Sequence, residues 1–332
     1  MASGFGYVAD SDEGLKIYDL SSNPSLHVVI NDDFMGEAIA ATGNVAVIVG
    51  EYMPTNTAHL EVLDISVPGL PTVRGELATS IPVNFSTGSG FFDVALNSTG
   101  TLAVVAAGTT GVLVVDLSNP SAPFVRGTYN TSGIAYGVAL NSTASLAYVA
   151  DGSAGLVIVS LSNPSQPTLI GSKTITGSVY RDVAVSGAYA YMANQQGTLD
   201  VLNVSTPSAP QRVAMKSISG SGVRVAVDGV RVGILSQSAL NGWVDFFDIS
   251  TPASPVLMGS VSTLSGEGGV AVASGFGYVA DSDEGLKIYD LSSNPSLKNT
   301  VHTVGDALDV VVRGSFAYVA DYPATIDIIS LP

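Results

Sequence analysis

Several similar segments of this sequence contain a Val-Ala pair or its equivalent, and a carboxylate residue often stands directly before that pair. Seven segments share this position, which is occupied by Glu37, Asp93, Gly137, Asp182, Arg224, Gly269 and Asp309. If the fold brings these segments side by side, four carboxylates converge, and an oxygen-rich ring suits a hard divalent cation. Alternatively, each acid accepts hydrogen bonds from its own segment's backbone or pairs with Arg224. The pattern predicts either a cation site, with calcium as the candidate ion, or a purely structural role.

A second group of acids lies in a short loop that occurs twice. The sequence Asp-Ser-Asp-Glu-Gly stands at 10–14 and again at 281–285. It resembles the start of a calcium loop, but it lacks the frame of about twelve residues with a terminal Glu that an EF-hand requires. Comparable segments replace the acids by Gly-Thr-Thr-Gly at 108–111 and by Gln-Gln-Gly at 195–197. The loop is therefore predicted to be an ordinary hairpin turn.

The residues needed for catalysis are sparse. The three histidines, His27, His59 and His302, follow no repeated Ser or Asp pattern. The glycine-rich segments 88–90 and 219–222 have no following Lys, so they do not match a phosphate loop. The acids before the Val-Ala pairs leave a hydrolase or lyase as a weaker alternative. We therefore expect no enzyme, no catalytic residues and no organic cofactor.

The composition limits the partners. The chain of 332 residues has 28 acidic and 12 basic residues, a formal net charge of −16, and no cysteine. This charge repels phosphate backbones and anionic lipid surfaces, so we expect no nucleic-acid partner. No apolar run reaches the roughly 18 residues of a membrane span, and we expect no membrane insertion.

Five N-x-S/T sequons bear on the compartment. The first twenty residues carry four acids and no basic segment, so they are not expected to be a signal peptide. A cytoplasmic protein and the mature part of an exported one both remain. Abundant Ser and Thr favour an extracellular or cell-surface protein, although such a composition also produces sequons by chance. The glycosylation candidates are Asn84, Asn97, Asn130, Asn141 and Asn203.

Internal repetition organises the chain. Residues 2–26 are identical to residues 273–297, and an Asp-Leu/Ile-Ser step recurs at Asp19, Asp64, Asp116, Asp248 and Asp290. Including weaker forms at Ser160, Asn203 and Ser330, successive steps lie 40 to 52 residues apart. Most are followed by Asn-Pro-Ser-x-Pro or Thr-Pro-x-x-Pro, which forms a turn and stops a strand.

Each repeat is predicted to form four short strands. In one repeat these are 93–96, 102–107, 112–116 and 124–128, short runs of Val, Ile, Ala and Tyr separated by Gly, Asn and Pro. The first strands are almost entirely apolar, so we expect them to be buried on both faces. No segment has helical periodicity. Repeats of about 40–45 residues with four antiparallel strands each predict an all-β fold, a β-propeller of four-stranded blades.

The third strand of the repeats resembles the signature strand of the LVIVD repeat. It is seen at 111–116 as Gly-Val-Leu-Val-Val-Asp and at 155–159 as Gly-Leu-Val-Ile-Val. The resemblance covers essentially the whole chain. It implies a propeller and a surface or exported protein of a mostly uncharacterised kind, and it implies no specific activity.

The number of blades depends on how the terminal strands are assigned. Seven first strands favour seven blades in a single domain, 1–332, closed by both termini. The last blade would then combine strands from Asp309–Leu331 with Leu26–Ile30 as its outer strand, leaving two surplus strands in Phe5–Leu20. The alternative is eight blades, the first without its inner strand and the last without its outer one.

Either assignment leaves strand edges that another chain can pair with. We therefore expect a non-enzymatic extracellular structural or interaction protein, a homo-oligomer or polymer such as a filament or surface-layer subunit, with terminal strand exchange. One alternative is a ligand-binding propeller with a polar or cation site and an unidentified protein or glycan as its partner. Another is that the duplicated N-terminal segment is of artificial origin and frays from the fold. The candidate assembly residues are Phe5, Tyr7, Leu15, Ile17, Tyr18, Ile328 and Leu331.

Overall fold

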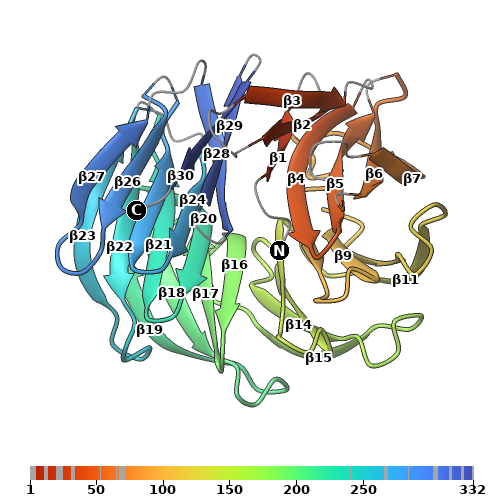
Figure 1. Ribbon diagram of the computed structural model, residues 1–332. Coiled ribbons are helices and arrows are strands. Elements are labelled where there is room, and N and C mark those ends of the chain that lie inside the picture. Colours follow the sequence, from red (N-terminus) through yellow and green to blue (C-terminus); the bar gives the residue numbers. More distant parts are fainter. Residues whose placement is uncertain are drawn as a thin grey trace. The chain divides into compact units, whose positions relative to one another are not determined.

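The protein is built of antiparallel β-sheets throughout its described residues. The computed structural model describes residues 5–10, 14–19, 25–30, 34–52, 54–64, 66, 72–239, 241–264, 268–282, 284–301, 306–313, 316–322 and 325–330. Within these ranges no helix is long and apolar enough to cross a membrane. The chain forms two compact units, Met1–Thr176 and Gly177–Pro332. In each sheet the strands lie side by side in chain order (Figure 1).

The first unit contains one three-stranded and three four-stranded sheets. The sheets are β1(Phe5–Asp10), β2(Gly14–Asp19) and β3(Ser25–Ile30); β4(Phe34–Thr42), β5(Val45–Tyr52), β6(Thr57–Asp64) and β7(Thr72–Pro82); β8(Asp93–Leu96), β9(Leu102–Ala106), β10(Val112–Asp116) and β11(Phe124–Tyr129); and β12(Gly137–Leu140), β13(Leu146–Ala150), β14(Leu156–Ser160) and β15(Thr168–Lys173).

The second unit contains three four-stranded sheets and one three-stranded sheet. The sheets are β16(Tyr180–Ser186), β17(Tyr189–Asn194), β18(Thr198–Asn203) and β19(Gln211–Ser217); β20(Ser221–Asp228), β21(Arg231–Gln237), β22(Gly242–Asp248) and β23(Val256–Thr263); β24(Val270–Ala273), β25(Phe276–Ala280), β26(Leu286–Asp290) and β27(Ser296–Val301); and β28(Asp306–Arg313), β29(Phe316–Tyr322) and β30(Thr325–Ser330).

The four-stranded repeat predicted from the sequence is confirmed. The strands expected at 93–96, 102–107, 112–116 and 124–128 are β8 to β11, with bounds that differ by at most one residue. Valine, alanine and leucine make up β9, and valine and leucine make up β10 up to its final Asp116. Glycines and the Asn-Pro turn end the two strands, as the strand signals indicated.

The prediction that Leu26–Ile30 completes the last sheet is wrong. These residues belong to β3, which pairs with β2 through Leu26 opposite Tyr18 and Ile30 opposite Leu15. The two strands are close in sequence, so their pairing closes only a short loop and costs little chain entropy. Among the described residues the sheets therefore number eight, as in the alternative assignment.

The duplicated sequence forms the same local structure twice. In β1 and β2, Phe5 lies opposite Asp19 and Ala9 opposite Leu15; in β25 and β26, Phe276 lies opposite Asp290 and Ala280 opposite Leu286. The pairing with the next strand shows a register shift at the same place in both copies. The two copies differ in one respect, because β25 has an inner neighbour, β24, whereas the described part of the first sheet begins at β1.

The core lies between the second and third strands of neighbouring sheets. All five residues of β9 and all five of β10 are buried, whereas in β8 only Val94 is buried. The expectation that the first strands are buried on both faces is therefore wrong for β8. A first strand lies at the edge of its sheet, and a second or third strand is flanked by strands on both sides and covered by sheets on both faces.

Glycines in the fourth strands allow neighbouring sheets to approach closely. A Cβ on Gly75 of β7 would lie 2.4 Å from the Pro120 carbonyl oxygen, and one on Gly127 of β11 would lie 2.3 Å from the Pro164 carbonyl oxygen. Both prolines belong to the Asn-Pro-Ser-x-Pro turn of the following sheet. The repeated turn thus stops a strand and also packs against the preceding sheet.

Candidate functional site

Two of the acids predicted to form a cation site connect neighbouring sheets. Asp93 accepts hydrogen bonds from the backbone N–H of Val94 at 2.8 Å and from that of Val138, in the next sheet, at 2.8 Å. Each of its two carboxylate oxygens accepts one backbone N–H. These contacts match the structural alternative considered from the sequence, extended to the following sheet.

Asp182 repeats this arrangement in the second unit. It accepts from the N–H of Val183 at 2.7 Å and from that of Val225, in the next sheet, at 2.9 Å. Burial raises the pKa of Asp182, although the Arg224 guanidinium and the two amides act to lower it. The acid is thus held at the junction of two sheets by donors that favour its charged form.

The other two predicted ligands are placed differently. Glu37 is exposed and lies at a register shift in β4, and Asp309 lies in β28 opposite Ala320. Glu37 and Asp93 belong to the first unit, Asp182 and Asp309 to the second. Over the residues that the structure describes, no group of three or more His, Asp or Glu side chains is arranged to hold a metal ion.

The acidic loop at 281–285 is a hairpin turn with a buried ion pair. Asp281 is only 1% exposed, accepts the Leu264 N–H at 2.5 Å and pairs with the Lys287 ammonium group. Lys287 also pairs with Glu284 at 2.5 Å. Burial by itself would lower the pKa of Lys287, but these two carboxylates raise it overall. The prediction of an ordinary turn is confirmed, and its first acid stabilises the hairpin.

The Asp-x-Ser step found in several repeats is a clamp at the end of the third strand. Its carboxylate accepts the N–H of the Ser two residues later, at 2.9 Å for Asp116 and Ser118. The Arg126 guanidinium, from the fourth strand, donates to the same carboxylate at 3.0 Å. The Ser118 amide, with Arg126, holds the pKa of Asp116 below its usual value. The same turn bond occurs at Asp64, Asp248 and Asp290.

The clamp depends on a β-bulge that the sequence did not reveal. Gly127 lies opposite Val114 and Val125 opposite Val115, so Arg126 between them has no partner in the ladder. A bulge redirects the side chain of its extra residue. Here it turns Arg126 toward Asp116. The basic residue at the same place in β7 is Arg74, which pairs with Asp64, and in β27 it is Lys298, which pairs with Asp290.

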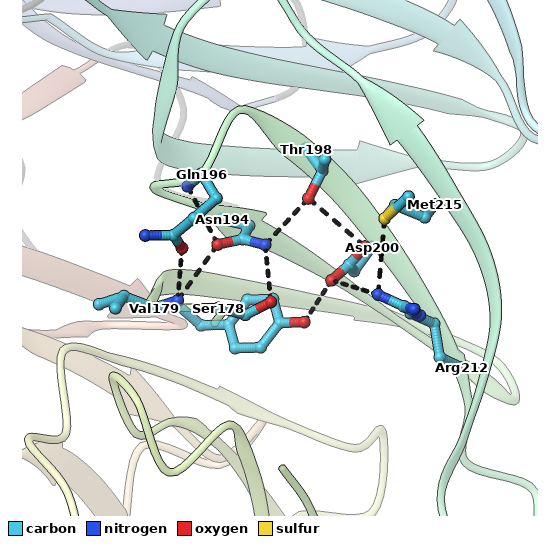
Figure 2. Close-up of polar contacts among 9 residues, drawn as sticks. Ser178, Val179, Asn194, Gln196, Thr198, Asp200, Arg212 and Met215 are labelled. Carbon is cyan, nitrogen blue, oxygen red and sulfur yellow. Dashed lines mark hydrogen bonds and ion pairs between the residues drawn. The ribbon is translucent and has the colours of Figure 1, made fainter. Parts of the chain in front are cut away.

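A buried polar network lies in the sheet β16–β19, as Figure 2 shows. Asp200 is fully buried and accepts from the Tyr180 hydroxyl, while the Arg212 guanidinium lies 3.6 Å from it. Burial, followed by the bond to Asp200, raises the pKa of Tyr180. Sequence reasoning missed this network, since Asp200 occupies an apolar position in a strand of otherwise ordinary pattern.

Asn194 connects this network to the loop before β16. Its side-chain amide donates to Ser178 at 3.0 Å and to Thr198 at 2.9 Å (Figure 2). Its oxygen accepts the N–H of Val179 at 3.2 Å. These buried groups satisfy one another, which is the arrangement expected of polar groups that stabilise a fold.

His59 is the one histidine whose side chain is described. Its ring stacks on Tyr52 with centroids 4.9 Å apart, and its Nε2 lies 3.1 Å from the Thr57 hydroxyl. Burial lowers its pKa, opposed by the charge of Glu76. These neighbours do not include a Ser–His–Asp arrangement. His27 lies in β3, and His302 lies outside the described residues.

The candidate assembly residues lie on the terminal sheets. Phe5 and Tyr7 are in β1, Leu15, Ile17 and Tyr18 in β2, and Ile328 in β30, where it lies opposite Tyr318; Leu331 falls outside the described residues. Among the described strands, β1 pairs only with β2 and β30 only with β29. Each of these two strands is thus an edge of a three-stranded sheet.

The outer strands expose apolar side chains that sequence analysis did not single out. Phe124 at the start of β11 is 52% exposed and Leu169 near the start of β15 is 49% exposed. The further exposed apolar residues of outer strands are Val73, Val125, Ile170, Met215, Val256, Leu257 and Leu297. Such an edge is usually protected by charge, and in β15 the bulge residue is Ile170 in place of a basic residue.

The five sequons occupy two kinds of environment. The side-chain amides of Asn97 and Asn141 donate to hydroxyl groups in their own turns, at 3.0 Å to Thr101 and at 3.0 Å to Thr143. The side-chain oxygens of Asn84 and Asn203 accept backbone N–H groups, from Thr87 and Ser205 respectively. Asn84 and Asn130 are exposed. The geometry therefore favours Asn84 and Asn130 over the others as accessible positions.

Comparison with known proteins identifies the repeat. The family model of the LVIVD repeat matches residues 2–30, 95–131, 144–174, 177–215, 244–263, 268–303 and 304–330. No curated protein matches the chain.

Solved structures share the fold at low identity. A functionally unknown protein from Desulfotomaculum acetoxidans is 15% identical with a TM-score of 0.71, covering 99% of this chain and 100% of that one. BamB from Moraxella catarrhalis is 14% identical with a TM-score of 0.69, covering 98% and 94%. The β-propeller domain of Cps50 (Swd1) from Myceliophteria thermophila is 11% identical with a TM-score of 0.68, covering 91% and 99%. These similarities indicate a β-propeller fold and nothing about activity.

Proposed function

The chain belongs to the LVIVD-repeat family, and from this starting point we propose that it is a non-enzymatic, extracellular structural or interaction protein that assembles with copies of itself. The observation that carries the proposal is the pair of three-stranded sheets at the two ends of the described chain, β1–β3 and β28–β30. Among the described residues, each of these sheets has one strand fewer than the six sheets between them, which leaves an open edge.

Strand addition is the simplest way for such edges to be covered. An edge strand has unpaired N–H and C=O groups that another chain's strand can satisfy. Residues 2–26 repeat residues 273–297, and both copies pair in the same register. The N-terminal segment thus has a side-chain pattern that already fits a sheet of this protein. In the proposed contact, the open edge β1 of one copy pairs with the open edge β30 of the next.

Such a contact joins two different surfaces, so it is heterologous. Heterologous contacts produce rings when the rotation closes and filaments when it does not. A filament or surface-layer subunit is the form of assembly that these features support.

Deletion of Ala2–Asn23 tests the proposal. The shortened and full-length proteins are compared by sedimentation velocity over a range of concentrations and by negative-stain microscopy. We expect polymers of the full-length protein and a folded, non-polymerising shortened one. A matched control, Leu169→Ser with Ile170→Ser, alters an interior edge and should leave polymers intact. A full-length protein that stays monomeric at high concentration would contradict the proposal.

The arrangement of the repeats is part of the same proposal. We propose that the sheets are the blades of one propeller closed through both termini. The eight sheets among the described residues favour eight blades over seven. Closure in this form leaves the outer edge of the last blade available to a neighbouring copy.

A further inference from the structure

One repeat of the second unit lacks the ion pair that joins the third and fourth strands in three other sheets. The register places Asn203 of β18 opposite Gln211 of β19, as Asp116 lies opposite Phe124. The bulge residue of β19 is Val213, because Ala214 lies opposite Val201 and Arg212 opposite Leu202. The carboxylate and the basic side chain of those three sheets are thus replaced by an amide and an isopropyl group.

This replacement coincides with a cavity of about 260 Å³. The cavity is lined by Asn203, Ser205, Thr206, Ala209, Gln211 and Val213. In the repeat of β10 and β11, the Arg126 side chain occupies the equivalent position, where it contacts Asp116 at 3.0 Å. Val213 is too short to do so.

The neighbouring Arg212 does not fill the cavity either. Its guanidinium lies 3.6 Å from the buried Asp200 and 3.5 Å from the sulfur of Met215, as Figure 2 shows. Ser205, Thr206 and Gln211 are exposed, so the cavity opens to solvent. It is therefore a surface cavity accessible to a ligand.

The lining residues specify the chemistry of that ligand. They provide two side-chain amides, two hydroxyl groups and the apolar surfaces of Ala209 and Val213, with no charged group. Asn203 is held in place, because its oxygen accepts the Ser205 N–H at 2.9 Å and the Ser205 hydroxyl at 2.6 Å. These residues include no carboxylate that could bind a cation, and the net charge of −16 disfavours an anionic ligand.

The volume limits the size of the ligand. Drug-sized molecules occupy pockets of roughly 300–1,000 Å³, so this cavity accepts something smaller. We propose that it binds a neutral, hydroxyl-rich ligand of the size of one sugar ring. Hydroxyl groups pair with the amides and with Thr206, and the C–H face of the ring packs on Ala209 and Val213. This proposal is independent of the self-assembly proposed above.

Two sources can supply a sugar to this cavity. One is a free saccharide or the end of a foreign glycan. The other is a glycan attached to Asn203, because Asn203-Val204-Ser205 is a sequon. The recognition chemistry is the same in both cases, and intact-mass measurement distinguishes them.

The test uses full-length protein from a host that does not glycosylate, with its unmodified mass verified. Saturation-transfer NMR is recorded with glucose, galactose, mannose and N-acetylglucosamine, each at millimolar concentration. We expect transfer to at least one sugar. The double variant Asn203→Asp with Val213→Arg introduces the Asp–Arg ion pair seen at Asp116 and Arg126 and should weaken binding at least tenfold.

Matched variants distinguish closing of the cavity from general effects of adding an ion pair to a sheet. Ser160→Asp with Ile170→Arg installs the same pair in the sheet β12–β15 and should leave binding unchanged. If the closing variant fails to fold, Gln211→Ala, at an exposed position, replaces it and should also weaken binding.

The glycan source is tested in a host that does glycosylate. An attached sugar predicts a mass increment that peptide mapping locates at Asn203 and that Ser205→Ala abolishes. This result would identify the glycan on Asn203 as the sugar at the cavity. The proposal is overturned if the unmodified protein shows no transfer with any sugar and Asn203 carries no glycan. Equal transfer in the wild type and the closing variant overturns it as well.

Discussion

At the scale of single residues, the acids of this protein hold the repeats together. Asp93 and Asp182 each accept one amide from their own strand and one from the next sheet. Asp116 joins a turn to a fourth strand through Ser118 and Arg126. Asp93 and Asp182 were two of the four acids predicted to form a cation site. Both instead cap backbone N–H groups of their own sheet and of the next one.

Replacing Asp182 tests this role. Asp182→Ala leaves the N–H groups of Val183 and Val225 without their acceptor, which costs about 1–3 kcal/mol for each buried donor, partly offset by removing a buried charge. Asp182→Asn keeps one acceptor oxygen and should cost less. The free energies of unfolding are compared by urea denaturation. Calcium at millimolar concentration should leave all melting temperatures unchanged. A calcium-induced rise that Asp182→Asn removes would instead establish the cation site.

The clamp at Asp116 should make stability depend on pH. Its folded-state pKa lies below the ordinary value of 3.8. The clamp therefore contributes stability that is present above pH 3.8 and is lost as the pH falls through the lower folded-state value. Asp116→Asn keeps the turn bond, as Asn203 does with Ser205. We expect it to cost about 0.5–1 kcal/mol at pH 7, because Arg126 is partly exposed.

The measurement is the difference in unfolding free energy between the two proteins from pH 7 to pH 2. The difference should shrink toward zero as the pH falls below 3.8. A difference that stays constant across this range would show that the charge of Asp116 is not what stabilises the clamp.

At the scale of elements, the Asn-Pro-Ser-x-Pro turn and the bulged fourth strand act together. The bulge turns Arg126 toward Asp116, and the adjacent Gly127 lets the turn of the next sheet approach to contact distance. The turn thus sets both the end of a strand and the distance between sheets. This explains why glycine stands beside the bulge in β7, β11 and β23.

Gly127→Ala should disturb this contact. The new Cβ would lie 2.3 Å from the Pro164 carbonyl oxygen, which is backbone and cannot move without shifting the turn. We expect a loss of about 1–3 kcal/mol in unfolding free energy, measured by urea denaturation. Thr128→Ala, at the next and exposed position, is the matched control and should change stability by less than about 0.5 kcal/mol. Equal effects of the two variants would rule out the close approach as the cause.

At the scale of the whole molecule, the repeats are nearly equivalent, and their differences indicate function. Three sheets have the ion pair between their third and fourth strands, formed by Arg74, Arg126 or Lys298. One sheet replaces it with Asn203 and Val213 beside a cavity. The described parts of the first and last sheets have three strands each. Departures from the repeat are therefore the places where binding and assembly are proposed.

A closed ring should unfold as one unit. If the blades form a single propeller, each blade is stabilised by both neighbours, and separating any pair destabilises the rest. We expect one cooperative calorimetric transition, with the calorimetric and van't Hoff enthalpies equal. Two well-resolved transitions, assigned to Met1–Thr176 and Gly177–Pro332 by limited proteolysis, would show instead that the two compact units fold independently.

The sequence by itself determined the repeat, its four strands and the hairpin at 281–285. These follow from local rules, because Val-rich runs form strands and Gly, Asn and Pro end them. The strands at 93–96 and 112–116 were predicted with their observed bounds. The family was also evident from the strand at 111–116, because a repeated unit keeps its pattern in every copy.

Only the tertiary structure decided what the acids and the irregular positions do. Asp93 and Val138 are 45 residues apart, and nothing local indicates that one accepts a hydrogen bond from the other. The pairing of Leu26–Ile30 with β2 depended on competition between two possible partner strands. The cavity at Val213 arises because a bulge directs that position toward Asn203, and strand pairing, which sequence periodicity does not specify, places the bulge.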